Sequence, residues 1–344
     1  MFEIDGSQKS GSGTILRLAV AIAAIKGEPL HITNIRANRP KPGLKPQHLE
    51  SVHAAAKLCN ADLKGASLGS SELWFTPHRI KGGEVKATIE TAGSIPILFL
   101  STLPICIHAD KPVRLHVAKG GTDTRYAPTI NYLRYVLLPT LAKMGVESEI
   151  SVQRYGYYPK GMGEATMNVH PTPKLKPFRL ERFGRITAIK GLSVCTYLSE
   201  RQVAERQAKA AQAVLARSDC KADVEVVNDR SNPLQKGSSI ALWAQTDTGI
   251  TLGADSIGEL RKSAEDVGKE AARKLLAELA FEVAADEFLS DMLIPYMAFA
   301  EGKSSFLTRT LTEHMESNIW LMEKMLNVKF FVEKVNNLVR IEKS

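Results

Sequence analysis

Three segments of the chain share one order of predicted elements, and this repeat restricts the possible folds more than any other feature. Each segment begins with an apolar helix and continues with a short strand, a loop and a second helix, and one or two further strands close it. The first helices are predicted at 13–27, 93–107 and 286–300, and the second helices at 47–61, 129–145 and 318–327. The repeat predicts stacked α+β modules that share one core.

A different pattern separates the second repeat from the third. After a Pro- and Lys-rich connection at 171–178 come a strand, a long helix, three strands and another helix. We therefore expect a small α/β domain inserted at 185–280, with residues 1–184 and 281–344 together forming the large domain. The predicted fold class is α/β, built from α+β repeats of the βαβ type.

The composition is typical of a globular protein, with 44% hydrophobic and 24% charged residues in a chain of 344. The longest apolar stretch, at 95–107, contains two prolines and is shorter than the roughly 20 residues of a membrane span. No secretory signal segment opens the chain. The four cysteines are scattered, without metal-binding spacing, so we expect reduced thiols in a cytoplasmic protein that does not contact a membrane.

Positive charge is concentrated in one loop. Lys and Arg exceed Asp and Glu by 45 − 37 = 8, and residues 31–49 carry Arg36, Arg39, Lys41 and Lys45 without any acidic residue. Such an excess attracts phosphate groups and favours a nucleic acid or nucleotide as partner. A solvated loop kept basic for solubility would have the same composition, so charge alone leaves both interpretations open.

His314 lies between the first strand and the second helix of the third repeat. A lone histidine in a loop is most often a surface or helix-capping residue. However, the equivalent loop of the first repeat carries Arg36 and Arg39, with His48 just beyond, and that of the second carries Asp123. If the repeats pack around a pseudo-threefold axis, these loops converge, as binding and catalytic loops do on a rigid scaffold.

Two charged residues are predicted within apolar helices. Arg17 needs an anionic or carbonyl partner if buried, and either a structural ion pair or a ligand phosphate would provide one. Asp291 either pairs internally or binds a ligand hydroxyl or a metal. The glycine-rich opening at 5–17 either holds a phosphate at a helix N-terminus or is a flexible turn, because its spacing matches neither the Walker A nor the dinucleotide motif.

Two kinds of catalytic site are excluded by spacing. His48 and His53 are five residues apart on one predicted helix, whereas a shared zinc ion favours four. The sequence GASLG at 65–69 matches G-x-S-x-G, but it lies between two predicted strands rather than in a strand–turn–helix elbow, so a serine hydrolase of that type finds no support.

Taken together, these residues resemble the RNA 3′-terminal phosphate cyclase family over essentially the whole chain. The matching motifs are DGSQKSGSGTILR, IRANRPKPGLKPQHL, TAGS, GGTDTRYAP, YYPKGMGE, EFLSDML and the His-x-x-x-Asn of HMESN. The resemblance implies a large domain of three repeats like the C-terminal domain of translation initiation factor three, with a small inserted α/β domain. The enolpyruvyl transferases share this repeat unit but not this active site.

The resemblance also implies an ATP-dependent ligase that acts on RNA 3′-phosphate ends. A histidine, here His314, attacks the α-phosphorus of ATP, and the adenylyl group then passes to the RNA 3′-phosphate. The neighbouring 2′-hydroxyl attacks the activated phosphate, forms a 2′,3′-cyclic phosphate and releases AMP. A neutral imidazole is a competent nucleophile near pH 7. Guanidinium groups and a divalent cation, Mg²⁺ or Mn²⁺, are implied to screen the phosphates.

The family's site residues can be carried over to this sequence. Arg17, Arg36 and Arg39 match positions that engage phosphates, and Asn318, one helical turn after His314, is placed to hold its loop. The residues implied to bind the nucleotide are Gln47, His48, Pro128, Phe288 and Asp291.

Three positions depart from the family pattern. Ser10 stands where a glutamate is thought to help hold the metal, Leu100 where a glutamine is usual, and Phe288 where a tyrosine is common. The metal ligands are therefore unknown. A non-catalytic cyclase-like protein that binds RNA or a ribosome-assembly partner stays open as an alternative, although that branch lacks the nucleophilic histidine. An enolpyruvyl transferase is the alternative from another enzyme class. The sequence leaves the oligomeric state open.

Overall fold

The computed structural model describes residues 1–172 and 174–344. Within these residues the strands form four mixed sheets of four strands each, and three of the sheets share one topology. In each of these three, the first two strands are parallel and the last two form an antiparallel hairpin that returns to the second strand. Their strand orders are β1-β2-β4-β3, β5-β6-β8-β7 and, from the opposite edge, β15-β16-β14-β9.

The three repeats contain the following elements. The first has β1 (Phe2–Asp5), α1 (Gly13–Lys26), β2 (Leu30–Thr33), α2 (Pro46–Cys59), β3 (Asp62–Lys64) and β4 (Leu73–Thr76). The second has β5 (Gly83–Thr88), α3 (Ile95–Cys106), β6 (Val113–Ala118), α4 (Ile130–Tyr132), the π-helical turn η1 (Leu133–Leu137), α5 (Leu138–Ala142), β7 (Ser148–Arg154) and β8 (Glu164–Val169). The third has β9 (Arg179–Leu180), α8 (Glu287–Phe299), β14 (Ser304–Thr308), α9 (Glu313–Met325), β15 (Phe330–Val335) and β16 (Leu338–Lys343).

The α/β class is confirmed, and each repeat also has a strand before its first helix. The strands β5 and β9 were not predicted. Both are edge strands, and β9 has two residues while β5 alternates charged and small apolar residues. Short, half-exposed edge strands give a weak apolar signal in the sequence.

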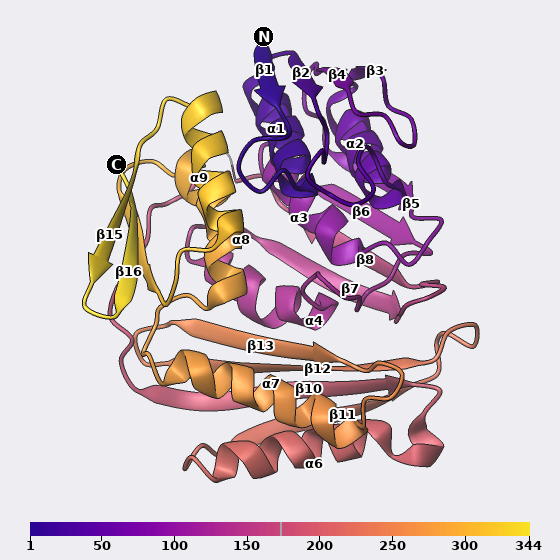
Figure 1. Cartoon of the computed structure of the whole chain (residues 1–344), viewed down its shortest axis with the longest axis vertical. Coiled ribbons are helices and arrows are strands. Elements are labelled where there is room, and N and C mark those ends of the chain that lie inside the picture. The colour runs from indigo at the N-terminus through magenta and orange to yellow at the C-terminus, as the bar shows by residue number, and fades with distance from the viewer. Residues whose placement is uncertain (173) are drawn as a thin grey trace.

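Helices from all three repeats build the centre of the molecule. Helix α1 contacts α2, α3 and α9, and α8 contacts both α3 and α9. Figure 1 shows these helices between the sheets, which lie toward the outside. Helix α1 is apolar nearly all round, and ten of its fourteen residues are buried. Among the described residues, no helix combines the length and apolar character needed to cross a bilayer.

The insertion forms the fourth sheet, of order β11-β10-β12-β13, and the predicted order of its elements is observed. Its elements are β10 (Ile186–Thr196), η2 (Ser199–Arg201), α6 (Val203–Ala216), β11 (Ala222–Asp229), β12 (Gly237–Thr246), β13 (Thr251–Ile257) and α7 (Ala264–Leu279). Helices α6 and α7 pack together against this sheet, at the bottom of Figure 1. The connection predicted at 171–178 includes residue 173, which lies outside the described residues.

The inserted sheet packs closely against the second repeat. Tyr135 stacks on Trp243 with 4.4 Å between ring centroids. At Gly253, an added Cβ would lie 2.4 Å from the side chain of Val136, so only glycine permits this approach. The Gly253 N–H also donates to the buried Asp286 carboxylate at 2.8 Å. The insertion is therefore fixed against the repeats by packing and by buried hydrogen bonds.

Candidate functional site

A cavity of about 690 Å³ lies where α1, α3, α8 and α9 meet the inserted sheet. Six of the ten predicted site residues line it: Arg17, Pro128, Phe288, Asp291, His314 and Asn318. Leu100, which replaces the family's usual glutamine, lines it as well. The other four predicted residues, Arg36, Arg39, Gln47 and His48, lie outside its walls. Of the three loops expected to converge, the loop before α4 and the start of α9 line the cavity, whereas the basic loop does not, and the first repeat contributes α1 instead.

His314 lies in the first turn of α9, so the loop predicted at 312–317 and the helix start predicted at 318 are both wrong. The helix begins at Glu313, because the Thr312 hydroxyl accepts from the Met315 N–H at 3.0 Å and caps the end. A threonine followed by acidic residues is a helix-start signal, and it could have placed this boundary. His314 is exposed on the cavity side of this turn.

The start of α9 is joined to α8 by hydrogen bonds to Asp291. The Thr312 hydroxyl donates to the Asp291 carboxylate, and Asn318 Nδ2 donates to the Asp291 backbone carbonyl at 2.8 Å. Burial raises the pKa of Asp291 to about 7, although the Thr312 bond opposes this. Asp291 thus has an internal partner and also faces the cavity. Asn318 Oδ1 is buried and has no hydrogen-bond partner among the described residues.

Arg17 is half-buried at the cavity wall, and no described residue forms an ion pair with it. Its guanidinium donates to the Thr14 hydroxyl at 3.1 Å. Burial, together with the charge of Arg36, lowers the pKa of Arg17 to about 10. A guanidinium held in this way, without an anion, is suited to bind one from outside. Of the two interpretations of Arg17, the structure therefore favours the ligand anion.

His48 packs beside Arg17, under the glycine-rich loop. A Cβ added at Gly13 would lie 2.3 Å from His48 Nε2 and 2.9 Å from Arg17 Nη1, so glycine is required there. Burial, then the charges of Arg17, Arg36 and Lys45, lower the pKa of His48 to about 2. The His48 ring is therefore neutral at any ordinary pH, and it supports Arg17 by packing rather than by charge.

The two arginines of the basic loop have different surroundings. Arg36 Nη1 donates to the carbonyls of Lys41 and Gly43, both at 2.8 Å, so this side chain holds the loop in shape. Arg39 is exposed and forms no ion pair with a described residue. Partial burial lowers the pKa of His314 below its ordinary value, and the positive charges of Arg17 and Arg39 lower it further. The positive charge of Arg39 in the basic loop therefore lowers the pKa of His314, although the loop lies outside the cavity walls.

Gln47 connects the first repeat to the second. Its Oε1 accepts from the Ser94 N–H at 3.0 Å, and Ser94 is the N-cap of α3. The structure places Gln47 at this helix end rather than in the cavity wall.

Ser10 belongs to a cluster of three serine hydroxyls. It donates to Ser12 at 3.0 Å and accepts from Ser317 at 2.9 Å, and Ser317 lies on α9, three residues after His314. Neutral hydroxyls that satisfy one another are poor ligands for Mg²⁺ or Mn²⁺, which prefer carboxylates. In the part of the chain that the structure describes, no group of three or more His, Cys, Asp or Glu side chains is placed to hold a metal ion. These residues do not fit a protein-bound divalent cation.

The insertion supplies a wall of the cavity that sequence reasoning missed. Lys262 and Lys274 share the Glu270 carboxylate, with N–O distances of 2.5 and 2.9 Å. Arg125, from the loop before α4, pairs with Glu259 after β13. Alternating charges on a helix such as α7 are typical of solvated faces, so the pattern gave no sign that these residues face a cavity.

The fold and the site define an α/β protein whose cavity presents the Arg17 guanidinium, without an anionic partner, beside an exposed histidine of lowered pKa. A family model described as RNA 3′-terminal phosphate cyclase matches residues 8–332, and the chain belongs to that family. The resemblance inferred from the motifs is confirmed.

Relatives named RNA 3′-terminal phosphate cyclase are similar over nearly their full length. The chain is 43% identical to that of Pyrobaculum aerophilum over 329 residues, which cover 95% of this chain and 93% of the relative. It is 41% identical to that of Methanopyrus kandleri over 332 residues (95% and 94%). It is 41% identical to that of Pyrococcus furiosus over 333 residues (97% and 95%).

Proposed function

We propose that the protein is an ATP-dependent RNA 3′-terminal phosphate cyclase of the ligase class. The observation that carries the proposal is the position of His314, exposed in the first turn of α9 and facing a cavity that Arg17 enters without an anionic partner. Full-length similarity to proteins named for this activity supports it.

In the proposed first step, an imidazole nitrogen of His314 attacks the α-phosphorus of ATP. The new N–P bond replaces the P–O bond to pyrophosphate, which leaves, and the ring loses its proton to water. The lowered pKa of His314 keeps the ring unprotonated and therefore nucleophilic. The positive end of the α9 dipole and the Arg17 guanidinium stabilise the negative charge that develops on the phosphate.

In the second step, an oxygen of the RNA 3′-phosphate attacks the phosphorus of the AMP bound to His314. A P–O–P bond to AMP forms, the N–P bond breaks, and His314 is regenerated. The 2′-hydroxyl then attacks the activated 3′-phosphate, loses its proton and expels AMP, leaving a 2′,3′-cyclic phosphate. Because this step needs a 2′-hydroxyl, RNA ends react and DNA ends do not. Pro128 and Phe288 offer apolar walls for the adenine, and Arg39 approaches the phosphates from the basic loop.

The proposal does not include a metal ion bound by the protein. The hydroxyls of Ser10, Ser12 and Ser317 hydrogen-bond to one another, so the proposal assigns no step to a cation held by the protein. The same cluster favours the second candidate, a cyclase-like protein that binds RNA or a ribosome-assembly partner without adenylylation.

The organisation of the chain is proposed as well. We infer that 185–280 is an inserted domain and that residues 1–184 with 281–344 are the large domain, because the fourth sheet takes all its strands from 186–257. The shared topology of the other three sheets supports the likeness to the C-terminal domain of translation initiation factor three. Cysteines 59, 106, 195 and 220 are free thiols, which suits a cytoplasmic protein.

The test is mass spectrometry of the denatured protein after incubation with ATP, with and without Mg²⁺ or Mn²⁺. The wild type should gain the mass of one AMP through an acid-labile bond, and His314→Ala should gain none. His53→Ala, which removes a half-exposed histidine on α2, is the matched control and should still gain it. Well-folded wild type that stays unmodified under every condition would favour the binding protein instead.

A further inference from the structure

Three large side chains at one edge of the cavity are unusually exposed. Tyr126 is 98% exposed, Leu260 97% and Tyr158 77%, and we call the two tyrosines the aromatic rim. Tyr126 itself lines the cavity. Its neighbour Arg125 donates to Glu259 at 2.8 Å, which brings the loop before α4 against the loop that carries Leu260. The N–H groups of Thr122 and Asp123 both donate to the Gly156 carbonyl, at 2.8 and 3.1 Å, so the loop that carries Tyr158 lies beside the loop that carries Tyr126.

The supports of the aromatic rim are buried and well connected. Asn232 is fully buried, and its Nδ2 donates to the carbonyls of Tyr155 and Gly161 at 2.7 and 3.1 Å, which fixes the loop that presents Tyr158.

Tyr126 has a φ of 63°, a conformation that non-glycine residues rarely adopt. A strained backbone that turns an aromatic ring outward is costly to keep, and such sites cluster where ligands bind.

Two exposed lysines, Lys160 and Lys236, lie near the aromatic rim. The Lys160 N–H donates to Gln235 Oε1 at 3.2 Å, so Lys160 and Lys236 come from loops that touch. Both side chains are exposed, and neither forms an ion pair with a described residue. Flat rings with unpaired cations next to them are the groups that bind single-stranded nucleic acid, since rings stack on bases and cations contact phosphates.

We propose that the aromatic rim binds the single-stranded stretch of RNA that leads to the 3′-phosphate, with Tyr126 and Tyr158 stacking on bases and Lys160 and Lys236 contacting backbone phosphates. The inference rests on the proposed function, because a 3′-phosphate that reaches His314 obliges the preceding nucleotides to leave through the cavity mouth. Stacking does not depend on the base, so this surface binds RNA ends of any sequence.

The test compares binding of a long and a short ligand. The long probe is a 3′-phosphorylated RNA of about ten nucleotides, within the site sizes of single-strand binders. The short probe is a 3′-phosphorylated mononucleotide. Tyr126→Ala with Tyr158→Ala should weaken binding of the long probe, followed by fluorescence anisotropy, by about 30-fold or more, since two stacked bases are lost. Binding of the short probe, followed by its competition with the labelled RNA for each variant, should be unchanged, as should the melting temperature, because exposed side chains leave no void.

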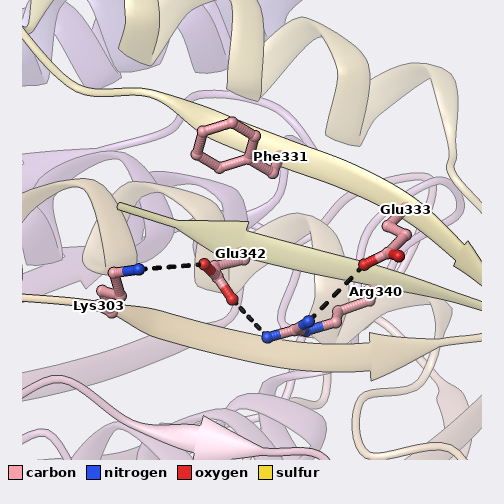
Figure 2. A pocket seen from close by; sticks show the side chains of 5 residues that line it. All are labelled: Lys303, Phe331, Glu333, Arg340 and Glu342. Carbon is pink, nitrogen blue, oxygen red and sulfur yellow. Dashed lines mark hydrogen bonds and ion pairs between the residues drawn. The ribbon is translucent and has the colours of Figure 1, made fainter.

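Two further measurements sharpen the test. Phe331→Ala is the matched control, since Phe331 is 58% exposed on β15 beside the ion pairs of Arg340 and Glu342, in a different cavity (Figure 2), and should leave RNA binding unchanged. Lys160→Ala with Lys236→Ala should lower the slope of log affinity against log salt by about 0.7 for each phosphate that the variant no longer neutralises.

Unchanged affinity for the long probe in the double tyrosine variant would overturn the inference, and the aromatic rim would then have another occupant, such as a protein. An equal loss for both probes would also overturn it, because the tyrosines would then act on the 3′-phosphate site. Adenylylation of the same variants with ATP alone keeps the two proposals separate. If the AMP adduct forms normally while RNA binding is unaffected by the substitutions, the inference fails and the proposed function stands.

Discussion

Replacing Thr312 by Val removes one hydroxyl that performs two tasks at the start of α9. The hydroxyl caps the helix through the Met315 N–H, and it donates to the Asp291 carboxylate. Loss of an N-cap costs about 1 kcal/mol, and loss of a hydrogen bond to a charged group costs about 1.5–3 kcal/mol. Because the raised pKa lets Asp291 take up a proton instead, we expect a total of about 2–3 kcal/mol in the free energy of unfolding.

This loss corresponds to a fall of about 3–4 °C in melting temperature, given the usual unfolding entropy per residue over a chain of this length. It should also depend on pH. The hydroxyl stabilises the ionised form of Asp291, whose pKa is about 7, so its removal costs more at pH 8 than at pH 5. Adenylylation of His314 should slow as well, since the first turn of α9 loses its anchor to α8.

Thermal unfolding at pH 5 and pH 8 measures both effects, with Thr312→Ser as the control that keeps the hydroxyl. A melting temperature that falls equally for Val and Ser, or by the same amount at both pH values, would refute this reasoning. The loss of stability would then not come from the hydrogen bond between the Thr312 hydroxyl and Asp291.

Three more predictions concern charge. Arg39→Ala should move the acidic limb of the pH profile of the adenylylation rate to higher pH, because the Arg39 charge lowers the pKa of His314. A limb that does not move would show that Arg39 has no effect on the pKa of His314. Arg36→Ala should lower stability in urea by about 1–2 kcal/mol because two hydrogen bonds to loop carbonyls are removed, whereas Arg39→Ala should not, and equal midpoints would contradict the different surroundings of the two arginines. Burial raises the pKa of Asp123 from 3.8 to about 7. The Asp123 contribution to stability is therefore full below about pH 4 and decreases by up to about 1.4 kcal/mol per pH unit toward pH 7; Asp123→Asn should flatten that dependence, and an identical pH profile of the urea midpoint would oppose it.

Periodicity predicted the repeats because their helices are long and buried on most sides. Helix α1 is the extreme case, and its position at the centre explains why an arginine within it is informative. The same reasoning missed β5 and β9, whose half-exposed residues give little apolar contrast. The predicted start of α9 at 318 is wrong because the helix is capped by the Thr312 hydroxyl, six residues earlier.

The site was only partly predictable because several of its contacts join residues far apart in the sequence. The pair of Arg125 with Glu259 spans 134 positions, and neither residue carries a local signal. The different tasks of Arg36 and Arg39 were also hidden, since both appear as cations in one basic loop. Only the fold decides which guanidinium bonds to its own backbone and which stays free.

The serine cluster joins Ser10 to Ser317 across 307 positions of the chain. A ribosome makes a protein from its N-terminus, so the basic loop and the glycine-rich opening leave the exit tunnel long before His314 has been translated. Under the proposed function, a nascent chain cannot consume ATP until α9, which carries the nucleophile, has been made. Translation that stops before residue 313 leaves a polypeptide that has Arg17, Arg36 and Arg39 but no His314. The order of synthesis thus keeps the ATP-consuming chemistry silent until all three repeats have contributed to the site.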